Sequence, residues 1–165
     1  MSNTHRCWVY GDNVNTDVIF PGKYTYTLKT PEEIASKALE DLDPTFATEV
    51  KTGDVIVAGR NWGMGSSREQ GVTSLKYAGV NCIIAESFSG LYFRNCINQG
   101  VLPIVCPGLN HVVQTGEQIE LDVTNNTITA AGNHFTFTPL SSSVKKIFDA
   151  GGLLPMLQKQ FATPK

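Results

Sequence analysis

The sequence lacks a long hydrophobic run and has no excess of basic residues. No segment of the 165-residue chain approaches the roughly 20 consecutive apolar residues of a membrane-spanning helix, and the first ten residues do not resemble a secretion signal. A formal net charge of -2 gives no basic surface for nucleic acid or an anionic membrane. We therefore expect a cytoplasmic protein whose partners are small molecules or other proteins.

Cysteine is also scarce, and its spacing is unsuited to metal binding. The chain has four cysteines, with no Cys-x-x-Cys pair and no close spacing of cysteine and histidine. Three of them lie within or beside apolar stretches, which predicts buried, reduced thiols and no metal bound by this chain. The cysteines are Cys7, Cys82, Cys96 and Cys106.

What the chain does contain is the pattern of a single α/β domain over residues 1–165. Hydrophobic residues make up 41% and charged residues 17%, as in a globular body. Short apolar runs at 55–58, 82–85 and 101–105 alternate with helical segments at 69–77 and 90–98. This alternation predicts a parallel or mixed sheet flanked by helices.

The two ends of the chain carry further elements. At the start, a strand over 7–10 precedes a polar turn, and Thr30-Pro31 begins a helix predicted to continue to about residue 43. After residue 116 the sequence predicts a β-hairpin (118–123 and 127–130), a strand (134–138) and two helices (141–150 and 153–161).

The strongest candidate for a functional site in the sequence is a predicted strand-to-helix turn, Gly59-Arg60-Asn61-Trp62-Gly63-Met64-Gly65-Ser66-Ser67-Arg68. Its glycines permit positive φ and close approach of the backbone to a ligand. Ser66 and Ser67 are expected near free amides at the helix start, and Arg68 offers a planar fork of donors. The turn is therefore expected to bind a small carboxylate.

Other known kinds of glycine turn do not fit this stretch. It lacks the lysine of a phosphate-binding loop, the three-glycine spacing of a dinucleotide fingerprint and the Gly-x-Ser-x-Gly of a hydrolase elbow. A purely structural alternative stays open, in which Ser66 caps the helix and Arg68 forms a surface ion pair. Asp17, at the edge of an apolar segment, could likewise cap a turn or support a site.

Taken in order, several stretches resemble one family. They are Gly11-Asp12-Asn13-Val14-Asn15-Thr16-Asp17, Gly63-Met64-Gly65-Ser66-Ser67-Arg68-Glu69, Ala85-Glu86-Ser87-Phe88 through Phe93-Arg94-Asn95, and Gly100-Val101-Leu102-Pro103. Together they resemble the small subunits of isopropylmalate isomerases and their relatives, which are equivalent to the swivelling domain of aconitase. The resemblance implies a single swivel-type domain with a flexible specificity loop at about 21–31.

The resemblance also implies a hydro-lyase that removes and re-adds water on a hydroxy-dicarboxylate, in leucine biosynthesis. In that family a 4Fe-4S iron–sulfur cluster is bound by three cysteines of a separate large subunit, so this chain would carry no cofactor itself. The family's roles make Ser66 the base that takes the carbon-bound proton, with Asp17 supporting it. They make Ser67 and Arg68 the groups that bind a substrate carboxylate.

The loop residues Tyr24, Thr25 and Tyr26 are expected to contact the substrate. In relatives that accept a third carboxylate, an arginine stands two residues after the loop tyrosine, and here that position is Tyr26. Burying an extra carboxylate without this cation is costly, so an alkyl-substituted malate is favoured. Isopropylmalate is the first expectation; a 2,3-dimethylmalate or citramalate-type substrate, or a non-catalytic small-acid-binding module, are the alternatives.

Overall fold

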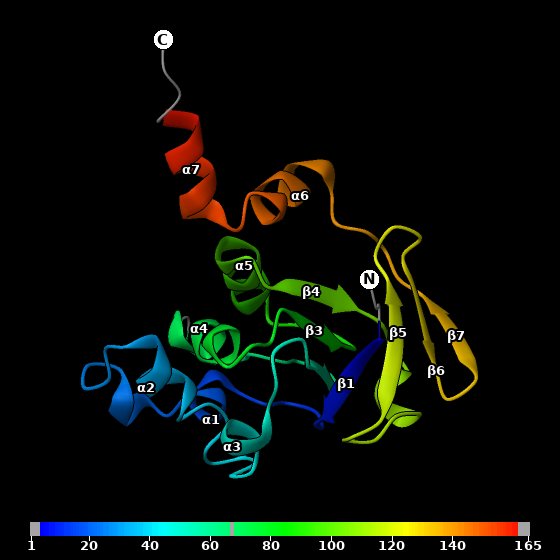
Figure 1. The fold of residues 1–165 in the computed structure, drawn as a ribbon, viewed down its shortest axis with the longest axis horizontal. Coiled ribbons are helices and arrows are strands. Elements are labelled where there is room, and N and C mark those ends of the chain that lie inside the picture. Colours follow the sequence, from blue (N-terminus) through cyan, green and yellow to red (C-terminus); the bar gives the residue numbers. More distant parts are fainter. Residues whose placement is uncertain (1–3, 67, 162–165) are drawn as a thin grey trace.

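The computed structural model describes residues 4–66 and 68–161, which form a curled seven-stranded sheet with helices packed against it (Figure 1). The strands are β1 (Thr4–Val9), β2 (Val55–Ala58), β3 (Cys82–Ala85), β4 (Leu102–Val105), β5 (Gln118–Asp122), β6 (Thr127–Ala130) and β7 (Asn133–Thr136). The longer helices are α4 (Gln70–Tyr77), α5 (Gly90–Gln99), α6 (Ser142–Asp149) and α7 (Leu153–Phe161). These elements confirm the α/β fold class and most of the predicted ranges.

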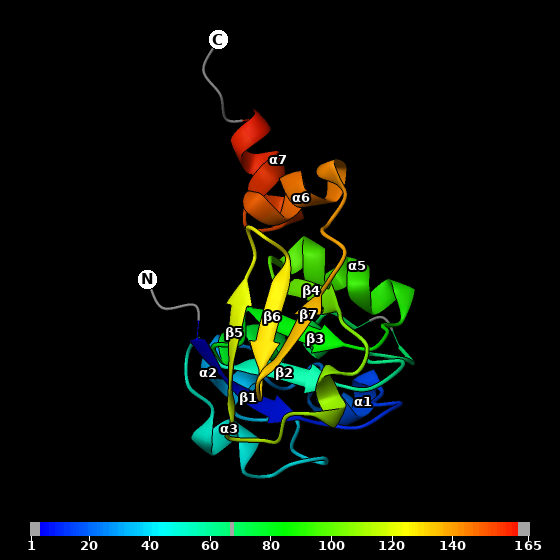
Figure 2. The same cartoon turned by 90° about the vertical axis from the view of Figure 1, so that its right-hand side faces the viewer.

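The strand order is β4-β3-β2-β1-β5-β6-β7. Strands β1 to β4 are parallel and β5 to β7 are antiparallel, and β1 belongs to both halves. Its first residues, Thr4 to Arg6, pair with β5, whereas Cys7 to Val9 pair with β2. Figure 2 shows the antiparallel strands lying across the parallel ones, so the sheet folds back on itself at β1.

This curl creates two apolar cores, one on each face of the parallel strands. Ile56 and Ala58 face the core beneath α4 and α5, while Val55 and Val57 face the core shared with β5 and β6. All four residues are at most 1% exposed. Burial on both faces explains why these strands are continuous apolar runs rather than alternating ones.

The segment between β1 and β2 departs from the prediction. It contains α1 (Thr16–Ile19), a 3-10 helix (Gly22–Tyr24), α2 (Pro31–Ala35) and α3 (Phe46–Glu49). Helix α2 begins after Thr30 as predicted, with a capping box between Thr30 and Glu33, but it ends at Ala35 instead of continuing to about residue 43. The chain turns because Leu39 adopts a φ of 56°, is fully buried, and donates its amide to the Ile19 carbonyl at 2.7 Å. Tertiary packing thus ends a helix that the sequence pattern would extend.

The C-terminal helices pack on α5 through a close backbone contact. Gly152, at the junction of α6 and α7, lies where a Cβ atom would overlap the Asn98 carbonyl oxygen. Only glycine permits this approach. Figures 1 and 2 both show α7 extending beyond α6, away from the sheet. Within the described ranges, no helix has the length and apolar character needed to cross a membrane.

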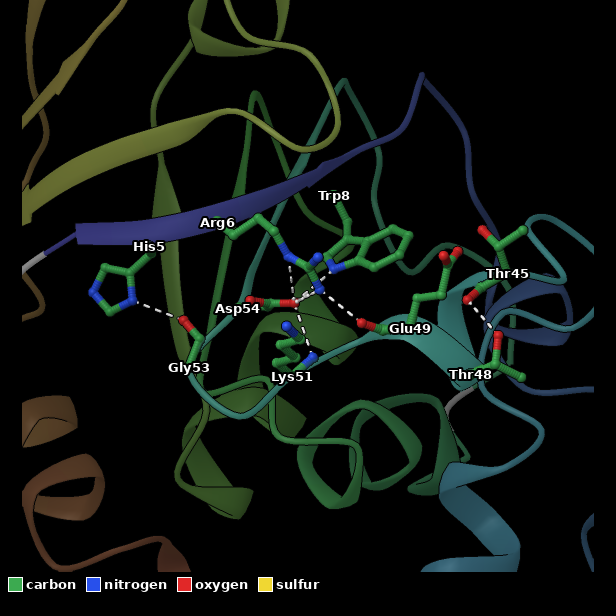
Figure 3. A network of polar contacts seen from close by, with 9 residues as sticks. All are labelled: His5, Arg6, Trp8, Thr45, Thr48, Glu49, Lys51, Gly53 and Asp54. Atoms are coloured by element: carbon green, nitrogen blue, oxygen red, sulfur yellow. Dashed lines mark hydrogen bonds and ion pairs between the residues drawn. The ribbon is translucent and has the colours of Figure 1, made fainter.

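A buried carboxylate stabilises the end of the sheet where β2 begins. One oxygen of Asp54 accepts hydrogen bonds from Arg6 Nη2 (2.7 Å) and Nε (3.1 Å), Trp8 Nε1 (2.9 Å) and the Lys51 amide (2.9 Å), as Figure 3 shows. Burial alone would raise the pKa of Asp54, but these donors outweigh that effect and lower it. The network joins β1 to the turn before β2.

Replacing Asp54 with alanine is expected to lower the free energy of unfolding by roughly 3 kcal/mol near neutral pH, because four donor atoms lose their acceptor. Urea unfolding of the isolated chain measures this. Since the pKa is lowered in the folded state, the carboxylate stabilises the fold above its unfolded pKa, near 3.9, and this contribution disappears as the pH falls through the folded value. Asp41→Ala, at an exposed aspartate, is the control; equal effects of the two changes would contradict the prediction.

Candidate active site

The predicted glycine turn and the loop after α1 together line an open hollow of about 530 Å³. It lies beyond the carboxyl ends of β1 and β2, where ligands commonly bind in parallel sheets. Its walls come from two regions that are distant in sequence, residues 15–26 and residues 64–68. The lining residues are Asn15, Thr16, Asp17, Gly22, Thr25, Tyr26, Met64, Gly65, Ser66 and Arg68.

Backbone hydrogen bonds hold the start of α1 beside the glycine turn. The Gly63 amide donates to the Val14 carbonyl and the Thr16 amide donates to the Met64 carbonyl, each at 2.8 Å. Gly63 has a φ of 81°, and a Cβ atom there would overlap the Tyr92 ring. Glycine is therefore required at this point by both conformation and space. The pairing places α1 directly against the turn that carries Ser66.

Ser66 does not cap the following helix. Helix α4 begins only at Gln70, with Glu69 as its N-cap, so the expectation of a serine at the helix start is wrong. The Ser66 hydroxyl instead accepts a hydrogen bond from Arg68 Nε at 3.0 Å and lies 3.0 Å from the hydroxyl of Thr16. Ser66 is exposed to the hollow. Both of its polar contacts are therefore with side chains that line the hollow, Thr16 and Arg68, rather than with the backbone of the helix.

Arg68 is the electrostatic centre of the hollow. Besides Ser66, its guanidinium donates to Thr25 Oγ1 (2.9 Å), Asp17 Oδ1 (2.8 Å) and the Phe20 carbonyl (3.4 Å). The side chain is 23% exposed, so it is partly shielded from water while one edge still borders the hollow. The alternative of a simple surface ion pair does not describe this arrangement, because one arginine joins α1, the loop and the turn.

Asp17 positions both Arg68 and the loop. Its Oδ1 accepts the Arg68 bond and a second bond from the Gly22 amide at 3.0 Å. A Cβ atom on Gly22 would lie 2.9 Å from that same oxygen, so a side chain there would disturb the contact. The Asp17 side chain is 73% exposed.

The loop residues are divided between the hollow and its surroundings. Thr25 contacts Arg68, and Tyr26 stands at the rim with 84% of its surface exposed. Tyr24 does not line the hollow: its hydroxyl donates to Glu40 at 2.9 Å, a bond that lowers the pKa of Glu40.

Ser67 lies outside the described residues. Thr16, which the sequence did not single out, is in the site, and its only sequence signal was its place beside Asp17.

The residues present do not suit ligation of an iron–sulfur cluster by this chain. In the part of the chain that the structure describes, no three histidine, cysteine or acidic side chains gather closely enough to bind a metal ion. The four cysteines are buried and unpaired, as predicted. Burial raises the pKa of each thiol, that of Cys7 to about 12, so the metal-binding thiolate is disfavoured.

Comparisons with known proteins agree with this geometry. The aconitase C-terminal domain family matches residues 11–108. The 3-isopropylmalate dehydratase small subunit 1 of Methanopyrus kandleri is 40% identical over 157 residues, covering 94% of this chain and 92% of the relative. The methanogen homoaconitase small subunit of Methanothermobacter thermautotrophicus is 42% identical, covering 90% and 86%.

A crystal structure of 3-isopropylmalate dehydratase from Methanocaldococcus jannaschii has a TM-score of 0.91 and 37% sequence identity, covering 98% of this chain and 96% of that one. The similarity thus extends over nearly the whole of each chain, in sequence and in structure, and confirms the resemblance found in the motifs. The protein belongs to the 3-isopropylmalate dehydratase small-subunit family, a hydro-lyase family whose fold includes the aconitase C-terminal domain.

Proposed function

We propose that this chain is the small subunit of a heteromeric hydro-lyase that interconverts 2-isopropylmalate and 3-isopropylmalate by dehydration and rehydration, in leucine biosynthesis. The observation that carries the proposal is the Ser66 hydroxyl, exposed in the hollow and hydrogen-bonded by Arg68, in a chain of this family. The large subunit would contribute the 4Fe-4S cluster, which supplies a Lewis acid for the departing hydroxyl.

Ser66 is the base of this proposal. In dehydration Ser66 first loses its hydroxyl proton to water, and the resulting alkoxide takes the proton from the substrate carbon. In hydration the serine hydroxyl returns a proton to carbon and the alkoxide is formed again. A serine alkoxide is a demanding base, because the free hydroxyl is very weakly acidic. Arg68 Nε, already 3.0 Å from Ser66 Oγ, favours the anion through a charge-assisted hydrogen bond.

Arg68 and Ser67 are proposed to bind a substrate carboxylate. The guanidinium borders the hollow and is oriented by Asp17 and Thr25. A bound carboxylate would replace Asp17 or Thr25 as a hydrogen-bond acceptor and would pair with the planar guanidinium instead. Asp17 therefore acts by setting the orientation of Arg68 rather than by taking the substrate proton.

The lining of the hollow favours an alkyl group over a third carboxylate. Among the described lining residues the one cation is Arg68, and it already faces the carboxylate of Asp17. A further substrate carboxylate would have no cation of its own, whereas an isopropyl group can pack beside Tyr26 and Met64. Since a homoaconitase small subunit is 42% identical, sequence identity alone does not choose between these substrates.

Replacing Tyr26 with arginine is expected to change this preference. The new cation would offer a charge-assisted bond to a third carboxylate, so the ratio of kcat/KM for homocitrate to that for 3-isopropylmalate should rise roughly 10-fold or more. Tyr77→Arg is the matched control, because Tyr77 is also exposed but lies on α4, outside the hollow. An unchanged ratio in Tyr26→Arg would show that the position does not select the substrate.

The proposed function is tested by reconstitution. The chain would be co-expressed with candidate cluster-bearing large subunits, purified without oxygen, and assayed for alkene formation from 3-isopropylmalate, 2,3-dimethylmalate, citramalate and homocitrate. We expect the isolated chain to be colourless and inactive and the complex to act fastest on isopropylmalate. Activity of the chain alone, or a clear preference for another substrate, would contradict the proposal. Binding of an acid without turnover in any complex would favour a binding module.

A further inference from the structure

Thr16 places a buried hydroxyl directly against Ser66. It is the first residue of α1 and is 3% exposed, and its Oγ1 lies 3.0 Å from Ser66 Oγ. Its backbone amide is bound to the Met64 carbonyl, two residues before Ser66. The position of this hydroxyl relative to Ser66 is therefore set by the pairing of the two segments and not by a mobile side chain.

The two halves of the Thr16 side chain face different surroundings. A Cβ atom added to Gly71 would lie 3.4 Å from the Thr16 methyl group, so the methyl packs against the first turn of α4. The hydroxyl points to Ser66 and toward the hollow. Packing requires only the shape of the side chain, which valine shares, whereas the contact with Ser66 requires the oxygen.

The protonation state of Ser66 decides whether the Thr16 hydroxyl donates or accepts the hydrogen bond between them. Arg68 Nε already donates to Ser66 Oγ, so a neutral Ser66 can direct its own proton to Thr16 Oγ1. An ionised Ser66 has no proton to donate, and the contact then persists only if Thr16 donates instead. The threonine hydroxyl can do either by rotation about its C–O bond.

From this geometry we infer that Thr16 is a positioning residue that donates to the Ser66 oxygen while Ser66 acts as a base. The inference rests on the proposed role of Ser66. In dehydration the proton moves from the substrate carbon to Ser66 Oγ, and the Thr16 hydroxyl turns from donor to acceptor as the charge disappears. In hydration the same steps run in reverse.

Three charged or titratable side chains line the described part of the hollow: Asp17 from α1, Tyr26 from the loop and Arg68 from the turn. Arg68 favours the anionic form of Ser66 and Asp17 opposes it, being tied to the same guanidinium. Thr16 adds a second donor to the anion without adding a charge. Loss of that donor should make the Ser66 oxygen harder to ionise, and activity should then require a higher pH.

The test compares Thr16→Val, Thr16→Ser and Thr73→Val in the reconstituted complex. Thr16→Val is expected to lower kcat roughly 10- to 100-fold, as for loss of a bond to a charged group, with little change in KM. The ascending limb of its pH–rate profile should move up by about 1 to 2 pH units. Thr16→Ser should keep kcat and the pH profile close to those of the original complex. Thr73→Val changes a different buried threonine, which lies on α4, and should leave both unchanged.

Thermal unfolding of each variant separates a change in the site from a loss of fold. If Thr16→Val lowers kcat but valine and serine variants share one pH profile, Thr16 acts through packing and the inference is overturned. If Ser66→Ala abolishes turnover and Thr16→Val does not alter it, the inference fails while the proposed function survives. If Ser66→Ala itself leaves turnover intact, the proposed function fails.

Discussion

Replacing Ser66 with alanine is expected to lower kcat of the reconstituted complex by roughly a thousandfold or more, with KM little changed. The variant removes the proposed base, and a positioned acid–base group commonly contributes 10²- to 10⁴-fold. KM should stay close to its original value, because the substrate carboxylate is assigned to Arg68 and its binding does not require the Ser66 oxygen. Steady-state kinetics with 3-isopropylmalate measures both constants.

The matched control for this change is Ser143→Ala on α6, an exposed serine outside the hollow. It should leave both kinetic constants at their original values. Because Ser66 is exposed and its turn is joined to α1 through backbone bonds, the alanine variant is also expected to unfold at nearly the original temperature. Full turnover by the Ser66→Ala complex would exclude this serine as the base.

Replacing Arg68 with lysine is expected to have the second-largest effect. Lysine keeps the charge but offers a single point donor in place of the fork that reaches Ser66, Thr25 and Asp17. We expect KM to rise roughly 10- to 100-fold, as for the loss of a charge-assisted bond. We also expect kcat to fall about 10-fold, because the Nε donor to Ser66 is lost.

The sequence alone predicts an effect on binding for this arginine, and the structure adds the effect on kcat. Arg60→Lys provides the matched control, because Arg60 is 70% exposed and pairs with Asp12 at 3.2 Å outside the lining of the hollow. Steady-state kinetics over a wide substrate range separates the two constants. If Arg68→Lys changes neither constant, the role assigned to the fork is contradicted.

The parallel half of the fold was predictable because its strands are buried on both faces. Val55–Ala58 and Cys82–Ala85 show in sequence as short β-branched runs, and the structure reproduces both ranges. The segment between β1 and β2 was less predictable. There Leu39 is apolar and fits a helical pattern, yet its burial against Ile19 requires a turn that local periodicity does not encode. Long-range contacts, invisible in a single sequence, decide that region.

The candidate site was likewise predictable from the sequence only in part. Ser66, Arg68, Asp17, Thr25 and Tyr26 were selected from residue type and motif, and the structure brings them around one hollow. Two features required three-dimensional contacts. The side-chain bond from Tyr24 to Glu40 joins residues 16 apart, and the Thr16 contact joins residues 50 apart. Neither residue pair has a local spacing that would reveal it.

The contacts of Arg68 have a consequence for selectivity among cellular anions. In the isolated chain its guanidinium already faces a carboxylate of the same molecule, Asp17, whose local concentration far exceeds that of any dissolved ion. Chloride, phosphate or a simple monocarboxylate would have to compete with that internal ligand using one weak contact. A dicarboxylate that also gains contacts elsewhere can displace it. We therefore expect the internal ion pair to weaken the binding of abundant small anions at Arg68 and to favour a ligand that binds at more than one point.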